Sequence, residues 1–600
     1  MALAIVSAKQ QRLGEMAQAM ARQLERFENL VSLFLTRAEE KGDKPFLWAK
    51  RDGAWRPISW NEAARQVAAL SASLKAMGLE PGDRVCLVSE NRPEWLIADL
   101  AIMAAGCVTV PTYTTNTSRD HAHILGNSGA RAVIVSNQKL AKNLIPAVLT
   151  STECHHVIGM EDIRSGQVPD WVNCHSWSKL VSGASDVGEL KRRMESVGRN
   201  DLACIIYTSG TGGAPRGVRL HHGSLLHNVE GCTDIISTDF GWDDEVFLSF
   251  LPASHAYEHT GGQLFPIALG AEIYYAESLE KLAANIEEVQ PTIMVVVPRL
   301  FEMLRARIIK SIEGAGGLSK YLLHRAMKIG SDKAAGGVKP WDLPMDGILS
   351  LTLRRKIRDK IGKRQKAWVS GGAPLNPEVG MFFQSIGITF LQGYGQTETG
   401  PVLACNRPSA GILLDTVGPP VKNTEVRIAD DGEIMVRGEL VMHGYWRNEE
   451  ETARVLKDGW LATGDVGHFD EKGRIKITDR KKDLIVNDKG DNVSPQRIEG
   501  MLTIQPEIAQ AMVYGDRRPH LVALLVPDPE IAKAEDLHAR LQAAVDRVNA
   551  DISVIEKVRR FILADEGFTI ENEQLTPSLK IRRHVISKVY GERLDSLYKR

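Results

Sequence analysis

Short apolar runs alternate with longer stretches of helical periodicity along the first two thirds of the chain. The runs are rich in β-branched residues, and each is followed by polar or helical sequence: DRVCLVSEN, RAVIVSN, LACIIYTSG, EVFLSFLP, AEIYYA and PTIMVVVPRL. A strand covered on both faces has this composition, and a helix usually joins it to its parallel neighbour. The pattern predicts an α/β domain of layered, largely parallel sheets over residues 31–478.

The pattern changes at about Val417. Closely spaced strands are now joined by Asp-Gly and Lys-Gly turns: EVRIADDGEIMVRG places Asp431 and Gly432 at the tip of a hairpin, and FDEKGRIKITD repeats the arrangement. Such dipeptides between alternating runs are typical of β-hairpins. This end of the large domain is therefore predicted to be a small, mostly antiparallel β unit.

Three further segments complete the predicted organisation. Residues 1–30 have the mixed-charge pattern of a helical extension. The glycine-rich and proline-containing region 314–347 is predicted to be an irregular excursion with short helical pieces. After the charge cluster DRKKDLIVNDKG, the strands AQAMVYG and HLVALLVPD alternate with helices. We place a linker at 479–485 and a small C-terminal α+β domain at 486–600.

Composition narrows the class of protein. The chain has 600 residues, 43% of them hydrophobic, with 74 Lys and Arg against 75 Asp and Glu, which predicts a globular protein of several domains and gives no reason to expect a nucleic-acid binder. Seven scattered cysteines without a CxxC pair favour a reducing, cytoplasmic compartment. No secretion signal and no apolar run of about 20 residues is visible. We expect any membrane contact to be peripheral.

The stretch YTSGTGGAPRGVRL, from Tyr207 to Leu220, combines four glycines with three small hydroxyl side chains and two arginines. Successive backbone N–H groups in such a loop can form an anion-binding nest, and the hydroxyls add donors, which suits a polyphosphate. The spacing is not that of a P-loop, because Val218 stands where that motif has its lysine. An ordinary flexible surface loop is the alternative.

This stretch resembles the phosphate loop of the adenylate-forming superfamily, which includes acyl-CoA synthetases, luciferases and peptide-synthetase adenylation domains and usually reads YTSGTTGxPKGV. Two positions depart from that form: Gly212 replaces a threonine, and Arg216 replaces a lysine and keeps its charge. The resemblance implies that the triphosphate is bound by Thr208, Ser209, Gly210, Thr211, Gly213 and Arg216.

Four more motifs follow in the order of this superfamily: SGGAPL, QGYGQTET, TGDVG and DRKKDLI, starting at residues 370, 392, 463 and 479. The resemblance covers roughly residues 30–600, and its long motifs are most similar to the long-chain fatty acyl-CoA synthetase branch. It implies a large α/β domain and a small mobile C-terminal domain. It adds to the nucleotide-binding set Gly371, Gly372, Ala373, Pro374, Gln392, Gly393, Tyr394, Gly395, Thr397, Asp465 and Arg480.

Several implied roles have a chemical reason. Glu398 and Thr208 offer hard oxygen atoms of the kind that Mg²⁺ binds. Asp465 can accept both ribose hydroxyls through its two carboxylate oxygens, and Arg480 can approach the same sugar. Tyr394 offers a flat face to adenine. The alternatives are a merely solvated Glu398 and a structural tyrosine at 394.

The resemblance implies a catalytic set of Lys580, Glu398, Thr208 and His255. Lys580, in LTPSLKIRR, would stabilise charge between the substrate carboxylate and the α-phosphate. His255, in LPASHAYEH, would face the acyl pocket or the carboxylate, and Lys482 corresponds to the hinge residue of the linker. A lysine that only meets solvent and a packing histidine are the alternatives at 580 and 255.

Three sequence features suggest other functions. HAYEH, residues 255–259, matches the zinc motif H-x-x-E-H of metalloproteases, but its flanks predict a strand end and loop instead of the helix that this motif needs. The groups CHH at 154–156 and CH at 174–175 match no zinc module. The basic segment 354–366 is predicted to be a solvated helix face, or alternatively a contact with anionic lipid.

These observations predict an ATP-dependent ligase that uses Mg²⁺, ATP, CoA and a fatty acid. The family chemistry has two steps: the carboxylate attacks the α-phosphate and releases pyrophosphate, then the CoA thiol attacks the acyl carbon and releases AMP. Two other functions stay open, namely a fatty acyl-AMP ligase that delivers to a carrier protein and a non-catalytic nucleotide-binding protein. The sequence does not indicate the acyl chain length or the oligomeric state.

Overall fold

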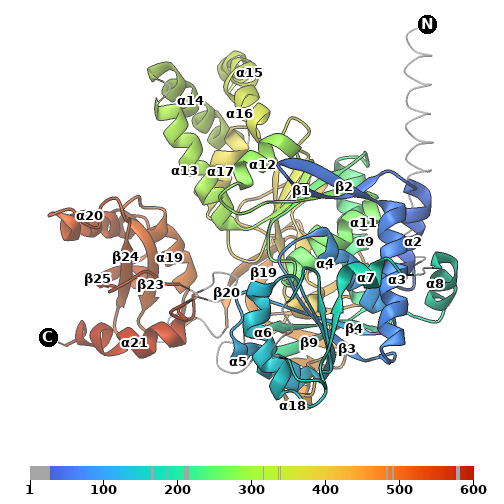
Figure 1. Cartoon of the computed structure of the whole chain (residues 1–600). Helices are drawn as coiled ribbons and strands as arrows, with labels where there is room; N and C mark the ends of the chain where they lie inside the picture. The colour runs from blue at the N-terminus through green and yellow to red at the C-terminus, as the bar shows by residue number, and fades with distance from the viewer. Residues whose placement is uncertain are drawn as a thin grey trace, which may run out of the picture.

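The computed structural model describes residues 27–163, 168–183, 186–208, 215–314, 316–334, 337, 339–481, 484–488, 492–569, 571–575 and 581–599. In Figure 1 a large body is accompanied on one side by a smaller unit that contains the C-terminus. The expected large α/β domain and small C-terminal α+β domain are both confirmed.

An eight-stranded sheet forms one layer of the body, in the order β15-β14-β13-β12-β10-β11-β1-β2. The strands from β14 to β1 are parallel, and β15 and β2 pair antiparallel at the two edges. The strands are β1 (Pro45–Arg51), β2 (Ala54–Ser59), β10 (Val246–Ser249), β11 (Glu272–Tyr275), β12 (Ile293–Val296), β13 (Ala367–Ser370), β14 (Phe390–Tyr394) and β15 (Ala404–Cys405).

A seven-stranded sheet forms the second layer, in the order β7-β6-β5-β3-β4-β8-β9. All of its strands are parallel except β9, which forms an antiparallel hairpin with β8. The strands are β3 (Arg84–Val88), β4 (Val108–Thr112), β5 (Ala130–Val135), β6 (His156–Gly159), β7 (Asn173–Ser176), β8 (Leu202–Thr208) and β9 (Arg216–His221). The predicted largely parallel α/β layers are therefore present.

Buried helices join the two sheets. Every residue of α4 (Pro93–Ala104) is buried, and this helix contacts β1 of one sheet and β3 and β4 of the other. A helix that is apolar on all sides is expected in such an interior position. The other helices of this region are α2 (Leu30–Lys41), α3 (Trp60–Ala76), α5 (Ser118–Ser128), α6 (Gln138–Thr150), α7 (Trp177–Val181), α8 (Val187–Met194), α9 (His222–Asp239), α10 (Ala256–Glu258), the π-helix η2 (His259–Leu264), α11 (Phe265–Leu269) and α12 (Leu282–Val289).

A group of helices projects from the body at the top of Figure 1. It contains α13 (Pro298–Gly314), α14 (Gly317–Ala334), η3 (Pro340–Asp342), α15 (Leu343–Leu351) and α16 (Leu353–Ile361), with α17 (Pro377–Ser385) packed against α13 and α14. The prediction of an irregular excursion with short helical pieces is wrong for much of 314–347, because α14 alone has 18 residues. Buried Ala326 and Ile329 on one side of α14 pack into the apolar core, and this packing stabilises the helix despite the flanking glycines.

The predicted antiparallel β unit is also confirmed. Its five strands are β16 (Glu425–Ile428), β17 (Glu433–Arg437), β18 (Leu456–Lys457), β19 (Trp460–Phe469) and β20 (Ile475–Arg480), with η4 (Thr397–Thr399), η5 (Pro408–Ala410) and α18 (Glu449–Val455) nearby in sequence. Gly432, with φ at 82°, forms the tip of the β16–β17 hairpin, as expected for an Asp-Gly turn.

The C-terminal unit has its own apolar core. A three-stranded sheet of β23, β24 and β25 packs against helices, and β21 pairs with β22 near the linker. The elements are β21 (Ile485–Val486), β22 (Asn492–Val493), α19 (Pro495–Thr503), β23 (Ile508–Tyr514), β24 (Leu521–Pro527), α20 (Leu537–Ala550), η6 (Val554–Glu556), β25 (Val558–Leu563) and α21 (Arg583–Ser596).

Candidate active site

The carboxyl ends of parallel strands bring several predicted site residues to one edge of the eight-stranded sheet. His255 follows β10, the SGGAPL turn follows β13, and Tyr394 is the last residue of β14. These strands run parallel through β12, so their carboxyl ends point the same way. This edge is where open α/β sheets bind ligands.

Strands β8 and β9 contain the described ends of the predicted phosphate motif. Thr208 ends β8 and pairs directly with Arg216, the first residue of β9. Strand β9 contacts η4, which contains Glu398. The hairpin therefore brings the predicted phosphate-binding hydroxyl and cation to the same region as the predicted metal ligand.

Tyr445 connects the cation and the carboxylate, and no sequence motif had indicated it. Its hydroxyl donates to Glu398 Oε1 at 2.9 Å, and the Arg216 guanidinium lies 4.7 Å from the centre of its ring. Burial, together with the Glu398 carboxylate, raises the pKa of Tyr445 well above its usual value. Its location follows from backbone pairing, because Tyr445 forms an antiparallel bridge with Val218 of β9.

Arg216 forms an ion pair with Glu451 of α18, which sequence analysis also missed. Glu451 accepts from Arg454 as well, so one carboxylate is shared by two guanidinium groups. The two cations lower the pKa of Glu451 against the opposing effect of burial. The side chain of Arg216, at the start of β9, is thus held by an acidic partner that balances its charge.

Tyr394, Asp465 and Arg480 meet as a second cluster, in agreement with the expectation that they share one binding region. The Tyr394 hydroxyl donates to Asp465 Oδ2 at 2.7 Å, and Arg480 Nε donates to Asp465 Oδ1 at 3.0 Å. Asp465 and Arg480 are cross-strand partners in β19 and β20. Each carboxylate oxygen has a second lone pair, so Asp465 can still accept further hydrogen bonds.

The turn after β13 is exposed from Gly372 to Pro374, with Ala373 between them. Gly371 is buried, and a Cβ atom there would lie 2.8 Å from the Tyr257 ring. Tyr257 in turn donates its hydroxyl to the Val369 carbonyl oxygen at 2.7 Å. Gly371 therefore allows the segment that follows His255 to pack closely against this turn.

The QGYGQTET motif begins on β14 and ends in η4. Gln392 is buried and donates to the Leu414 carbonyl oxygen at 2.6 Å, so its side chain faces the chain's own backbone. A Cβ atom at Gly395 would lie 1.7 Å from the Pro401 carbonyl oxygen, which excludes any side chain there. Gly393 makes only ordinary contacts, and Thr397 is the half-buried first residue of η4.

The prediction of a loop for the HAYEH segment is wrong. It forms α10 and the start of η2, and His255 is the N-cap residue, with Nδ1 accepting from Tyr257 N at 3.2 Å. Glu258 accepts from Ser249 Oγ at 2.6 Å. His259 Nε2 lies 2.7 Å from Asp99 Oδ2. Glu258 and His259 of the H-x-x-E-H motif thus contact two different buried partners, Ser249 and Asp99.

Other predicted features have mixed outcomes. His156 and His175 lie on the neighbouring strands β6 and β7, with Nδ1 and Nε2 3.1 Å apart, whereas Cys154 and His155 precede β6. The solvated-face prediction for 354–366 is wrong at Arg354, which is buried and pairs with Asp346 at 2.7 Å.

Some of the predicted residues lie outside the part of the chain that the structure describes. They are Ser209, Gly210, Thr211, Gly212, Gly213, Lys482 and Lys580, together with residues 1–26 of the predicted N-terminal extension.

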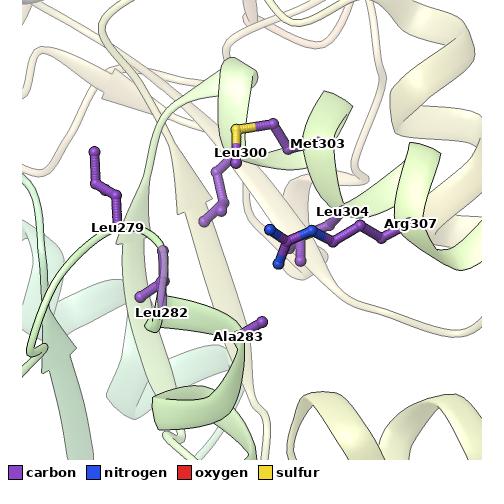
Figure 2. Close-up of a pocket in the computed structure, with 7 residues that line it drawn as sticks. All are labelled: Leu279, Leu282, Ala283, Leu300, Met303, Leu304 and Arg307. Carbon is purple, nitrogen blue, oxygen red and sulfur yellow. The ribbon is translucent and has the colours of Figure 1, made fainter.

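A small apolar hollow lies between α12 and α13, with Arg307 at its edge (Figure 2). Its other lining residues are Leu279, Leu282, Ala283, Leu300, Met303 and Leu304. The volume is about 10 Å³, room for roughly one water molecule. The hollow is too small to hold an acyl chain.

Comparison with known proteins agrees with this arrangement. The AMP-binding enzyme family model matches residues 34–446, and the AMP-binding enzyme C-terminal domain model matches residues 482–600. The chain belongs to the AMP-binding enzyme family.

Two relatives and one solved structure illustrate the similarity. The chain is 32% identical to the long-chain-fatty-acid–CoA ligase FadD15 of Mycobacterium bovis, over 93% of this chain and 95% of the relative. It is 30% identical to the peroxisomal long chain acyl-CoA synthetase 7 of Arabidopsis thaliana, over 95% and 86%. The adenylation domain of a carboxylic acid reductase from Segniliparus rugosus, solved with AMP and a co-purified carboxylic acid, has a TM-score of 0.74 at 21% identity, covering 98% of this chain and 96% of that one. This last similarity supports the fold.

ATP and CoA as substrates fit this family. In the part of the chain that the structure describes, no helix combines the length and apolar character needed to cross a membrane.

Proposed function

We propose that the protein is a long-chain fatty acid–CoA ligase that works through an acyl-adenylate. The observation that supports the proposal is the pair of clusters around Tyr445 and Asp465, in which Arg216, Glu398 and Asp465 of the family's motifs are held by side-chain contacts. The 32% identical relative named a long-chain-fatty-acid–CoA ligase supports the substrate class.

The first step needs groups that bind and orient the triphosphate. Arg216 would contact the β- and γ-phosphates once it exchanges Glu451 for the nucleotide, and the hydroxyl and N–H groups of the phosphate motif would add donors. Asp465 and Arg480 would hold the ribose, and the turn at 371–374 with Tyr394 would hold adenine. These positions leave the α-phosphate free for attack by the fatty acid carboxylate, which forms the acyl–phosphate bond and releases pyrophosphate.

Thr208 and Glu398 would hold Mg²⁺, since both offer oxygen donors and the hairpin that ends at Thr208 contacts η4. Bound there, the ion would neutralise charge on the phosphates. Tyr445 orients Glu398 through its hydrogen bond, and Lys580 would stabilise the negative charge that develops on the α-phosphate.

The second step requires a rearranged site, because the carboxylate oxygen attacks the α-phosphate in the first step and the thiol attacks the acyl carbon in the second, and the two attacking groups cannot occupy the same place. We propose that residues 479–485 form the linker between a large domain at 31–478 and a mobile domain at 486–600, with Lys482 as its hinge. The CoA thiol then attacks the acyl carbon, and AMP leaves. His255, after β10, is proposed to face the acyl group.

We also propose a cytoplasmic location with peripheral contact on the inner face of a membrane. Long-chain fatty acids partition into lipid, so the substrate is most concentrated there. The seven cysteines are all free, as a reducing compartment requires.

Product analysis tests the proposed function. With palmitate, Mg-ATP and CoA, the purified protein should form equal amounts of AMP, pyrophosphate and palmitoyl-CoA. ADP and phosphate as products would contradict the adenylate route. Formation of palmitoyl-AMP that CoA does not consume would instead favour a carrier protein as the acyl acceptor.

A further inference from the structure

We infer that α15 and the cations that border it form a docking face for an anionic lipid bilayer. The docking face comprises the apolar residues Trp341, Leu343, Ile348 and Leu351 together with the basic residues Lys339, Arg355, Lys356 and Arg358. The inference rests on the proposed function in one respect, because a long-chain fatty acid substrate would be concentrated in the lipid bilayer.

The apolar part of the docking face is a stripe along one side of a helix. Leu343, Ile348 and Leu351 are 57%, 48% and 73% exposed, and Gly347 between them is also exposed. Positions i, i+4, i+5 and i+8 fall on one side of an α-helix, while Leu349, on the other side, is fully buried. The helix thus presents Leu343, Ile348 and Leu351 to solvent on one face and Leu349 to the core on the other.

Trp341 extends the stripe beyond the start of α15. It is 73% exposed, and Lys339 Nζ lies 6.0 Å from the centre of its ring. Tryptophan and lysine side by side are typical of the boundary between lipid headgroups and acyl chains. At nine residues α15 is far too short to span a bilayer, but it is long enough to lie within this boundary.

The two acidic residues next to the apolar stripe are paired with cations, and the exposed Asp359 of α16 forms an ion pair with Lys363 at 3.6 Å. Asp342 is buried and pairs with Arg325 at 2.5 Å, and Asp346 accepts from both Lys333 at 2.9 Å and Arg354 at 2.7 Å. The negative charges next to the apolar stripe are thus neutralised within the helical group, and they do not oppose an anionic surface.

The charge that remains is strongly positive. Residues 298–366 contain 17 Lys and Arg against six Asp and Glu, an excess of 11 positive charges in a chain whose formal net charge is −1. Arg355, Lys356 and Arg358 on α16 are exposed, directly after the apolar stripe. Basic side chains beside an exposed apolar helix face are complementary to anionic headgroups over acyl chains.

The location suits this contact. In Figure 1, α14, α15 and α16 form the part of the body that stands furthest from the two sheets. In the same view the smaller C-terminal unit lies below these helices, so a flat bilayer can reach their ends without contacting it. The small hollow with Arg307 at its edge lies on α13, at the base of the same group.

Flotation with lipid vesicles tests the inference. The full-length protein should float with vesicles of phosphatidylcholine and phosphatidylglycerol, and much less with phosphatidylcholine alone or at high salt. The triple substitution Leu343→Ser, Ile348→Ser and Leu351→Ser should lower the apparent affinity at least tenfold. The triple substitution Arg355→Gln, Lys356→Gln and Arg358→Gln should lower it by about fivefold for each cation removed.

Matched controls come from the C-terminal unit. Val554 and Ile555 are 68% and 44% exposed on η6, so Val554→Ser with Ile555→Ser removes exposed apolar side chains from another part of the molecule. This control should float like the unmodified protein. All variants should keep the same ligase rate on fatty acid dispersed in detergent, because none of the substituted residues belongs to the candidate active site.

Three results would overturn the docking face: no flotation of the unmodified protein, flotation of both triple variants at the level of the unmodified protein, or a dimer in solution that the serine variant converts to a monomer. The last result would assign the stripe to a second copy of the chain. Vesicle binding without acyl-CoA formation would refute the proposed function and leave the docking face standing, so the two failures are distinguishable.

Discussion

At the scale of single residues, Tyr445 is the side chain that joins the charged groups of the candidate phosphate site. Its hydroxyl donates to Glu398, and its ring lies under Arg216. The raised pKa of its phenol keeps the proton on the hydroxyl at neutral pH. Orienting a carboxylate before a ligand arrives reduces the conformational entropy lost on binding.

Replacing Tyr445 by phenylalanine removes the hydrogen bond and keeps the ring. Because a hydrogen bond to a charged group contributes about 1.5–3 kcal/mol, we expect kcat/KM for fatty-acid-dependent pyrophosphate release to fall by roughly 10–100-fold. Tyr321→Phe, on the exposed side of α14, is the matched control and should be without effect. An unchanged kcat/KM in Tyr445→Phe would mean that the hydroxyl does not orient Glu398.

Arg216 and Arg454 form a natural pair for comparison, since both contact Glu451. If Arg216 supports the β- and γ-phosphates, Arg216→Ala should cost about 1.5–3 kcal/mol in the adenylation step. Arg454→Ala should not slow this step, because it removes only an exposed contact on α18. Equal rates for the two alanine variants, measured by pyrophosphate release, would remove Arg216 from the site.

Glu258 predicts a dependence of stability on pH. Complete burial raises the pKa of its carboxyl group from 4.5 to about 8, so the folded protein holds a proton that the unfolded chain releases above its own pKa. The contribution of this group to stability is therefore present below pH 4.5 and is lost as the pH rises to 8.

The neutral variant Glu258→Gln should not lose this contribution. We expect its melting temperature, relative to that of the unmodified protein, to increase between pH 6 and pH 8.5 in a thermal-shift titration. Ser249 and Gln263 remain as hydrogen-bond partners for the amide. A constant difference across that pH range would show that Glu258 is charged in the folded protein.

The sequence motifs predicted which of their own residues lie together in the candidate site, but not which residues outside the motifs contact them. Tyr394, Asp465 and Arg480 lie in recognisable motifs and do meet. Tyr445 and Glu451 lie in none. Tyr445 reaches the site through its backbone bridge to β9, more than 220 residues earlier in the chain, and no local pattern encodes such a long-range pairing.

At the scale of elements, periodicity predicted the sheets better than the segment around His255. Gly261 and Gly262 suggested a loop, yet both lie in the π-helix η2. A Cβ atom at Gly262 would lie 2.2 Å from a Glu258 carboxylate oxygen, and one at Gly261 would lie 3.1 Å from Val295 of β12. These glycines permit close packing against the sheet, and the sequence alone does not distinguish that use from a turn.

The linker is the element whose motion the proposed two-step reaction requires. Proline fixes φ near −65°, so Lys482→Pro should hold the C-terminal domain in one orientation. This variant should still form acyl-adenylate and transfer it poorly to CoA. Lys580→Ala should show the opposite defect, scarcely forming acyl-adenylate but converting it when supplied.

Pre-formed acyl-adenylate, CoA and the two folded variants suffice for this experiment. Transfer at the unmodified rate by Lys482→Pro would show that residue 482 is not the hinge.

At the scale of the whole molecule, the near-neutral total charge conceals an uneven distribution. The segment 298–366 has an excess of 11 positive charges, and the rest of the chain must therefore carry a net negative charge to give the total of −1. Sequence analysis noticed the basic residues at 354–366. It could not predict the apolar stripe of α15, because exposure depends on which side of the helix packs against the core.

The central claim is that the carboxylate of the fatty acid attacks the α-phosphate of ATP. Palmitate labelled with ¹⁸O in both carboxylate oxygens tests this directly, since the oxygen that bridges carbon and phosphorus stays with AMP when the thiol displaces it. Mass spectrometry after turnover with Mg-ATP and CoA should find one ¹⁸O atom in each AMP and none in pyrophosphate. Label in inorganic phosphate, or AMP without label, would contradict the acyl-adenylate mechanism.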